Sequence, residues 1–166
     1  AGLLVSDQDF ESEFRAYNRY YFDPEFEILV PDPVYLPVQG SETTLLAEAL
    51  LRGPTGWLAP AVRSAFPDNT ALGVPVTLEA GRASVELTSE ATTDTTDEQR
   101  EQMAAQLAWT LEQVDGVQQT SVTSGRVPLT DADPTVRAVE SFGRYDPASL
   151  PRHRSLYAVT EAGVVM

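Results

Sequence analysis

The residues from Thr96 to Val114 carry the clearest structural pattern in this sequence, because they read as one amphipathic helix with both ends marked. Thr96 and Gln99 have the spacing of a capping box, in which the hydroxyl accepts a hydrogen bond from the first helical turn. Asp115-Gly116 is typical of a helix end. Such a helix must bury its apolar face against another element. That face is formed by Met103, Leu107, Leu111 and Val114, widened by Ala104 and Ala108.

The flanking segments predict the sheet that this helix needs. Residues 74–78 and 83–87 form the two arms of a hairpin, and apolar residues alternate with polar ones on the second arm. Gly81 supplies the positive φ of the turn between them. Residues 117–123 predict a further strand directly after the helix.

A second helix is expected from Ser41 to Arg52. Ser41 can cap it, Glu42 suits the positive first turn, and Gly53-Pro54 ends it. The two helices and the three strands predict an α+β fold with two helices packed on one face of a small mixed β-sheet. The apolar stripe of this second helix consists of Leu45, Leu46, Ala49 and Leu50.

The first third of the chain is rich in aromatic residues and proline. A helical turn capped by Ser6 or Asp7 is expected to run through Phe10 and Phe14. Aromatic residues then predict a strand at 17–22. A second extended run, 28–30, is closed by three prolines that favour an edge strand or a surface connection. A short irregular segment is expected to bury Trp57, Val62 and Phe66.

The charge balance restricts the partners of the chain. Eleven basic residues against 25 acidic ones give a formal net charge of −14. A nucleic-acid partner is therefore not expected, because phosphate neutralisation requires a basic face. The sequence has no cysteine, which excludes disulfides and thiolate metal sites. No apolar run approaches the roughly 20 residues that a membrane-spanning helix requires.

No motif for catalysis, a metal or a cofactor is present. His153 stands between basic neighbours in a predicted loop, without an evident nucleophile or orienting carboxylate. Asp131-Ala-Asp133 lacks the downstream residues of a calcium loop, so we interpret it as a linker turn. Pairs of acidic residues are many, but none is distinguished by spacing. We therefore expect a non-enzymatic domain without a cofactor.

Aromatic residues supply the candidates for a binding surface, and Trp57 could join the tyrosines in lining a sugar or peptide site. Tyr17, Tyr20, Tyr21 and Tyr35 crowd one short segment bounded by proline, and tyrosine contributes strongly to interfaces. Successive strand residues point to opposite faces, so Tyr20 and Tyr21 cannot both point inward. The alternative interpretation is that all four pack within the sheet.

The sequence pattern changes after residue 130, where linker-like breaks replace the long helix and strand patterns, and two domains are expected. Residues 1–130 form the α+β domain, and residues 131–166 form a linker with short strands, including a hairpin from the 156–159 and 164–166 runs. The chain begins without Met and stops on an apolar residue, so we expect it to be a piece of a longer protein.

Several stretches together resemble the GerMN domain of sporulation and germination proteins, and in particular the GerMN domain of LpqB-type actinobacterial lipoproteins. The similarity extends over about residues 17–129. Its most specific parts are the helix that ends in Arg52-Gly53-Pro54 and the segment Trp57-Leu-Ala-Pro-Ala61. The remaining parts are residues 17–23, 29–33, 66–67, 74–87, 107–111, 116–117 and 125–129.

The resemblance implies a fold similar to the GerMN and ring-building-motif fold. It also implies an extracytoplasmic lipoprotein, held at the membrane only by a lipid anchor outside this chain, whose C-terminal β-propeller begins within residues 131–166. The implied partners are that propeller and the extracellular sensor domain of a two-component histidine kinase of the MtrAB type, in cell-wall growth and division. No catalytic residue is implied.

Two other functions remain open from the sequence. A ligand-sensing domain for peptidoglycan or peptide fragments would show a tyrosine-lined pocket. An enzyme would show polar groups converging in a cleft.

Overall fold

The computed structural model describes residues 13–131 and 136–149, and the backbone of residues 158–160 and 163–165. It has the predicted α+β composition. In chain order the elements are β1 (Phe14–Phe22), β2 (Leu29–Pro37), α2 (Glu42–Leu51), η1 (Ala59–Ala61), β3 (Thr77–Glu79), β4 (Arg82–Leu87), η2 (Ser89–Thr92), α3 (Asp97–Leu111), β5 (Gln119–Ser124), β6 (Val127–Pro128), β7 (Val136–Arg137), η3 (Val139–Tyr145), β8 (Ala158–Thr160) and β9 (Gly163–Val165).

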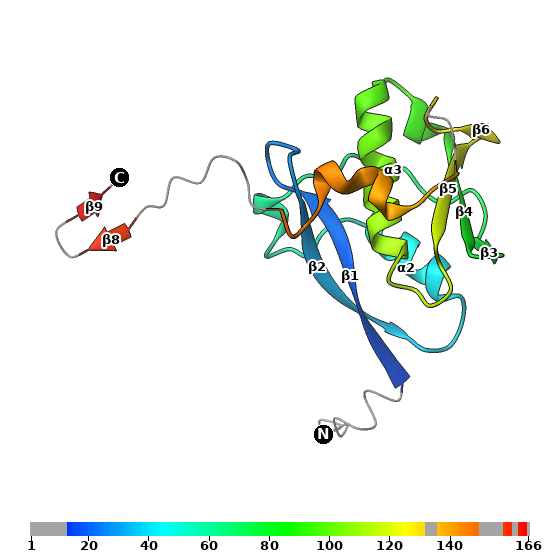
Figure 1. The fold of residues 1–166 in the computed structure, drawn as a ribbon, viewed down its shortest axis with the longest axis horizontal. Helices are drawn as coiled ribbons and strands as arrows, with labels where there is room; N and C mark the ends of the chain where they lie inside the picture. The colour runs from blue at the N-terminus through cyan, green and yellow to red at the C-terminus, as the bar shows by residue number, and fades with distance from the viewer. Residues whose placement is uncertain (1–12, 132–135, 150–157, 161–162, 166) are drawn as a thin grey trace.

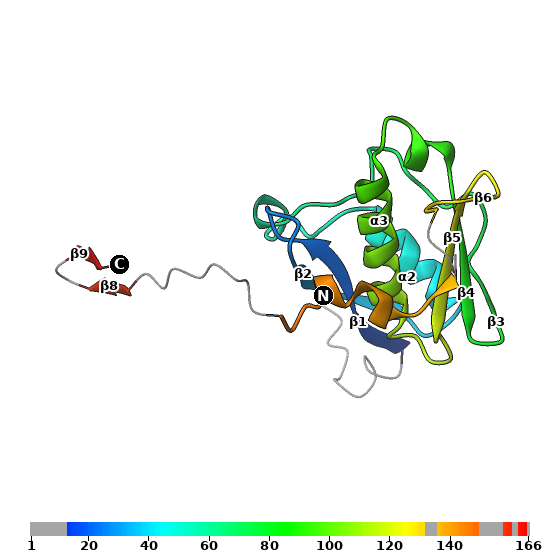
Figure 2. The ribbon, with the colours of Figure 1, turned by 45° about the horizontal axis from the view of Figure 1, so that its top comes forward.

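Helices α2 and α3 lie between a mixed sheet and a β-hairpin, as Figures 1 and 2 show. The sheet has the order β3-β4-β5-β6, and β7 also pairs with β5. Strands β4 and β5 are parallel and are joined through α3, whereas the other pairs are antiparallel. The helices and this sheet confirm the predicted packing. The hairpin of β1 and β2 forms a further layer on the opposite side of the helices.

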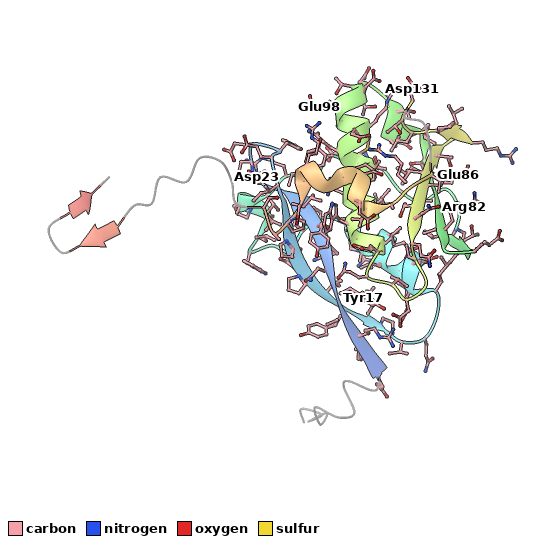
Figure 3. The ribbon with its side chains drawn as sticks, in the orientation of Figure 1. Tyr17, Asp23, Arg82, Glu86, Glu98 and Asp131 are labelled. Carbon is pink, nitrogen blue, oxygen red and sulfur yellow. The ribbon has the colours of Figure 1, made fainter. Side chains whose placement is uncertain are left out.

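The predicted N-terminal caps and core stripes are confirmed, whereas α3 ends at Leu111, before the expected end at Val114. The Ser41 hydroxyl accepts a hydrogen bond from the Thr44 N–H at 3.4 Å, and Thr96 accepts one from Gln99 at 3.1 Å. The alternation on β4 is also confirmed, and Figure 3 shows Arg82 and Glu86 on the solvent side of this strand. Side chains with no exposed surface include Leu46, Leu50, Leu107 and Leu111.

Helix α3 is buried on almost every side because it has a sheet on one flank and the hairpin on the other. Its buried surface therefore includes polar residues. The Gln106 side chain donates a hydrogen bond to the Tyr20 carbonyl oxygen at 2.8 Å, and the Thr110 hydroxyl accepts one from the Tyr20 N–H at 3.2 Å. Gln106 also accepts a hydrogen bond from the Ala65 N–H at 2.7 Å. Polar side chains of α3 thus satisfy the edge of β1 in place of a third strand.

Strand β2 continues through three prolines instead of ending before them. Pro31 lies opposite Tyr20, whose backbone groups point to α3 and away from β2. In an antiparallel pair such positions alternate with hydrogen-bonded ones, so the backbone of Pro31 faces the outer edge of β2, which pairs with no strand among the described residues. Pro33 and Pro37 lie an even number of residues from Pro31, so their backbone groups face the same edge. Because proline has no N–H, this edge offers few hydrogen-bond donors, as is typical of edge strands.

Two N-terminal expectations need correction. Phe14 begins β1 and does not end a helical turn. Trp57 is 72% exposed, whereas Val62 is buried as expected and Phe66 is partly buried. The backbone between Thr55 and Ala61 turns so that Leu58, not Trp57, enters the core. The expected caps at Ser6 and Asp7, with Phe10, lie outside the described residues.

Residues 136–145, here called the C-terminal arm, lie beyond the expected boundary at residue 130 but pack against α3 (Figure 1). Phe142 and Tyr145 have only 2% and 1% of their surface exposed, and the Tyr145 ring meets Phe22 edge-on at 5.0 Å. Arg137 forms two hydrogen bonds with the Glu101 carboxylate, at 2.5 and 2.7 Å. The arm therefore completes the hydrophobic core.

Strands β8 and β9 pair antiparallel, which matches the hairpin expected near the end of the sequence. A propeller that begins there stays a prediction. His153 lies outside the described residues.

Candidate interaction surface

The β1–β2 hairpin has two faces of opposite character. Residues directly opposite each other in an antiparallel pair lie on the same face, and successive residues alternate between faces. One face, here called the outer hairpin face, carries ten residues without a formal charge at neutral pH, although the chain has a net charge of −14. These are Phe14, Ala16, Asn18, Tyr20 and Phe22 on β1, and Pro37, Tyr35, Pro33, Pro31 and Leu29 opposite them on β2; Phe22 and Leu29 are buried.

Among the described residues, the outer hairpin face is largely exposed at one end and covered at the other. Tyr35 is 59% exposed, and the three prolines of β2 are exposed with it. Towards the other end, the half-buried Tyr20 ring meets Trp109 edge-on at 6.1 Å. The Trp109 indole N–H donates to the Phe142 carbonyl oxygen at 3.4 Å, which links this end to the C-terminal arm. Burial raises the pKa of Tyr20, so its hydroxyl is neutral at physiological pH.

The inner hairpin face packs on α2 and takes the other two tyrosines. The Tyr21 ring is fully buried, and its hydroxyl donates to the Leu50 carbonyl oxygen at 2.8 Å. Burial raises the pKa of Tyr21. Tyr17 is 5% exposed and lies within the domain (Figure 3). The four tyrosines proposed from the sequence are therefore divided, and only Tyr20 and Tyr35 lie where a partner could reach them.

A buried ion pair fixes the inner face to the loop after α2. Arg19 and Asp32 are 2.7 Å apart with almost no exposed surface. The Arg19 guanidinium also donates to the carbonyl oxygens of Ala49 and Gly53, at 3.1 and 2.9 Å. Asp32 accepts hydrogen bonds from the N–H and the hydroxyl of Thr55, at 2.8 and 2.9 Å. One pair thus joins β1, β2, the end of α2 and the loop.

Sequence reasoning expected the prolines of β2 at an edge strand or a surface connection but did not propose them as binding residues, and it expected Trp57 in the core. The sequence does contain a signal for the prolines. Every second position from 31 to 37 is Pro31, Pro33, Tyr35 or Pro37, and these residues must share a face if the strand continues. No comparable local signal existed for Trp57, whose exposure follows from the turn at Thr55.

Within residues 13–131 and 136–149, no group of three or more His, Asp or Glu side chains is placed to hold a metal ion. Among the described residues, no helix combines the length and the apolar character that crossing a membrane requires. The hollow lined by Phe26, Ser64 and Gln102 is open to solvent, and Thr96 and Glu98 also line it.

The α+β fold of this chain is shared by solved GerMN domains. The chain belongs to this family, since the family described as "Germane: Sporulation and spore germination" matches residues 18–130. The tandem GerMN domains of the sporulation protein GerM from Bacillus subtilis share the fold, with a TM-score of 0.51 and 20% identity over 69% of this chain and 40% of that one.

The chain is also similar to actinobacterial lipoproteins. It is 39% identical over 124 residues to Lipoprotein LpqB of Thermobifida fusca, a match of 70% of this chain and 19% of that protein. It is 31% identical over 142 residues to Lipoprotein LpqB of Mycobacterium leprae, which covers 78% of this chain and 24% of that protein. The chain therefore spans about a fifth to a quarter of the length of these relatives.

Proposed function

We propose that this GerMN domain is a non-enzymatic interaction module of a lipid-anchored extracytoplasmic protein. In this proposal it binds the extracellular sensor domain of a two-component histidine kinase of the MtrAB type and modulates its signalling in cell-wall growth and division. The anchor and a C-terminal β-propeller belong to parts of the protein outside the described domain. The similarity to LpqB lipoproteins supports the location.

The outer hairpin face is the contact surface in this proposal, and its composition is the observation that carries it. A protein with 25 acidic residues keeps this face free of charge and exposes a tyrosine and three prolines there. The cores of protein interfaces are depleted in charged residues and enriched in aromatic ones. Tyr35 is the exposed aromatic of the face, so it is the expected anchor.

Binding on this face would occur by side-chain packing and not by strand addition. Strand addition relies on main-chain hydrogen bonds at a free sheet edge. The free edge of β2 carries Pro31, Pro33 and Pro37, which cannot donate.

A tyrosine-lined ligand pocket is less well supported. Tyr17 and Tyr21 lie on the inner face, whereas Tyr20 and Tyr35 lie on the outer one, so the four rings do not converge around one cavity.

The test compares Tyr35→Ala with Val127→Ala, an equally exposed apolar residue on β6. Binding of the immobilised kinase sensor domain is measured by interferometry. Tyr35→Ala should weaken binding at least about tenfold, which corresponds to ~1.4 kcal/mol, while its thermal unfolding midpoint stays unchanged. Val127→Ala should bind as the parent does. Unchanged affinity in both Tyr35→Ala and Tyr35→Glu contradicts the proposed contact surface.

A further inference from the structure

A second exposed apolar feature lies on the loop that follows α2, here called the Trp57 loop (residues 53–61). Trp57 is 72% exposed, more than any other large apolar residue of the described core domain. Leu58 is buried and ties the loop to the core. In Figures 1 and 2 the loop lies at the end of the molecule where β1 turns into β2. The exposed neighbours of Trp57 are small and uncharged: Gly56, Ala59, Pro60 and Ala61.

The loop is held in one conformation by buried groups. Asp32 binds both the N–H and the hydroxyl of Thr55, and Arg19 binds the Gly53 carbonyl oxygen. The Thr55 carbonyl oxygen in turn accepts hydrogen bonds from the N–H groups of Leu58 and Ala59, at 3.0 and 2.9 Å. An exposed indole on a loop that is anchored in this way loses little conformational entropy when it binds a partner or enters a membrane surface.

The loop also differs in charge from the rest of the chain. Between Glu48 and Asp68 the ionisable residues are Arg52 and Arg63, and no acidic residue occurs. The Arg63 guanidinium donates to the Val62 carbonyl oxygen at 2.8 Å, so it lies against the loop. The acidic turn around Asp23 adjoins Arg63 through paired backbone bonds of Phe22 and Arg63. The positive charge is therefore local and small.

We propose that the Trp57 loop rests in the lipid–water interface of the membrane that carries the protein. Indole rings favour this interface, because one edge is polar and the body is apolar. Five exposed residues are too few for a stable protein interface, which buries about 800 Å² on each partner. They are sufficient for a shallow insertion next to anionic headgroups, with Arg52 and Arg63 at its rim.

This inference rests on the lipid anchoring in the proposed function. A net charge of −14 opposes contact with an anionic surface from a distance. An anchor removes that obstacle, since it holds the domain at an effective concentration of about millimolar near the bilayer. At physiological salt, charges beyond about 8 Å are largely screened. The charge close to the loop therefore determines whether the loop can approach an anionic membrane surface.

The two surfaces do not compete. Asp32 lies on the inner hairpin face and holds Thr55, so the Trp57 loop lies on that side. Tyr35 lies on the outer face, because it is three residues from Asp32 on β2 and alternate residues of a strand point to opposite faces. A domain seated on lipid through Trp57 therefore keeps its outer hairpin face available to a protein.

The experiment reads Trp57 directly. The chain carries two tryptophans, so the parent and Trp57→Phe differ only in the exposed one, while Trp109 reports the background in both. Each is tethered through an added N-terminal polyhistidine tag to phosphatidylcholine–phosphatidylglycerol vesicles that contain a nickel-chelating lipid. Emission is compared between vesicles with and without brominated acyl chains.

Brominated lipid should quench the parent and shift its remaining emission, whereas Trp57→Phe should show no quenching. Equal quenching in the two proteins, or none in either, overturns the inference. Trp57→Phe should also keep the parent's affinity for the kinase sensor domain. A negative result in the lipid experiment would therefore contradict only the inference on the Trp57 loop. A negative result in the Tyr35 experiment would contradict only the proposed contact surface.

Discussion

Gln113 binds both backbone groups of Asn18: its amide oxygen accepts a hydrogen bond from the Asn18 N–H at 2.8 Å, and its amide nitrogen donates to the Asn18 carbonyl oxygen at 2.7 Å. One side chain near the end of α3 thereby takes the place that a neighbouring strand would have. The first strand of the hairpin is fastened to α3 at a point about two helical turns from Gln106.

Replacing Gln113 by leucine should therefore lower the free energy of unfolding by about 1–3 kcal/mol, because Asn18 loses partners for a donor and an acceptor. Urea unfolding followed by circular dichroism measures the loss. Gln39→Leu, at an exposed position, is the matched control and should change little. If both variants unfold at the same urea concentration, water satisfies the Asn18 backbone instead.

Asp32→Asn should lower the free energy of unfolding by about 3–5 kcal/mol, because it leaves the buried Arg19 guanidinium without its counter-ion. The Thr55 bonds would weaken as well, since Asp32 accepts both. Glu48→Gln removes an exposed acidic group from α2 and serves as the control. A cost for Asp32→Asn as small as that of Glu48→Gln would show that Arg19 finds another partner.

Phe142→Ala should cost about 3–5 kcal/mol, as expected for a buried phenylalanine. The C-terminal arm would then prove part of the same cooperative unit as α3, although the sequence places it beyond the domain. Ser141→Ala, at the exposed neighbouring position, should unfold with the parent. An unaltered midpoint for Phe142→Ala would mean that the arm contributes nothing to the stability of the core.

Ala80→Asn should stabilise the protein by about 1 kcal/mol. Ala80 and Gly81 both have positive φ, +48° and +80°, as a two-residue type I′ hairpin turn requires. Alanine is strained in that region, by about 1–2 kcal/mol, whereas asparagine tolerates it. Ala71→Asn, at an exposed residue without positive φ, is the control. A lower melting temperature for Ala80→Asn contradicts this account of the turn.

The parts of the fold that the sequence predicts correctly depend on neighbours along the chain. The caps at Ser41 and Thr96 and the stripe through Leu107 and Leu111 are such features. Burial of Gln106 and Thr110 could not be predicted, because it depends on where β1 lies across α3. The burial of Phe142 could not be predicted for the same reason, since its partners come from distant segments.

For the candidate surface, the sequence establishes that Tyr20 and Tyr21 face opposite ways but not which one faces outward. The choice depends on α2, since the Tyr21 hydroxyl reaches the Leu50 carbonyl oxygen across a distance of 29 residues in the chain. The position of Tyr35 follows from its register with Ala16, which only the paired strands reveal.

The prolines of β2 also bear on how safely such a surface can be displayed. An unpaired sheet edge next to an uncharged apolar face can serve as a template on which other chains add strands and stack into fibrils. Pro31, Pro33 and Pro37 interrupt that template at three of the four positions 31, 33, 35 and 37 along this edge. The domain can therefore present an uncharged face with exposed side chains beside a sheet edge that is poor in hydrogen-bond donors, which lowers the risk of stacking between copies.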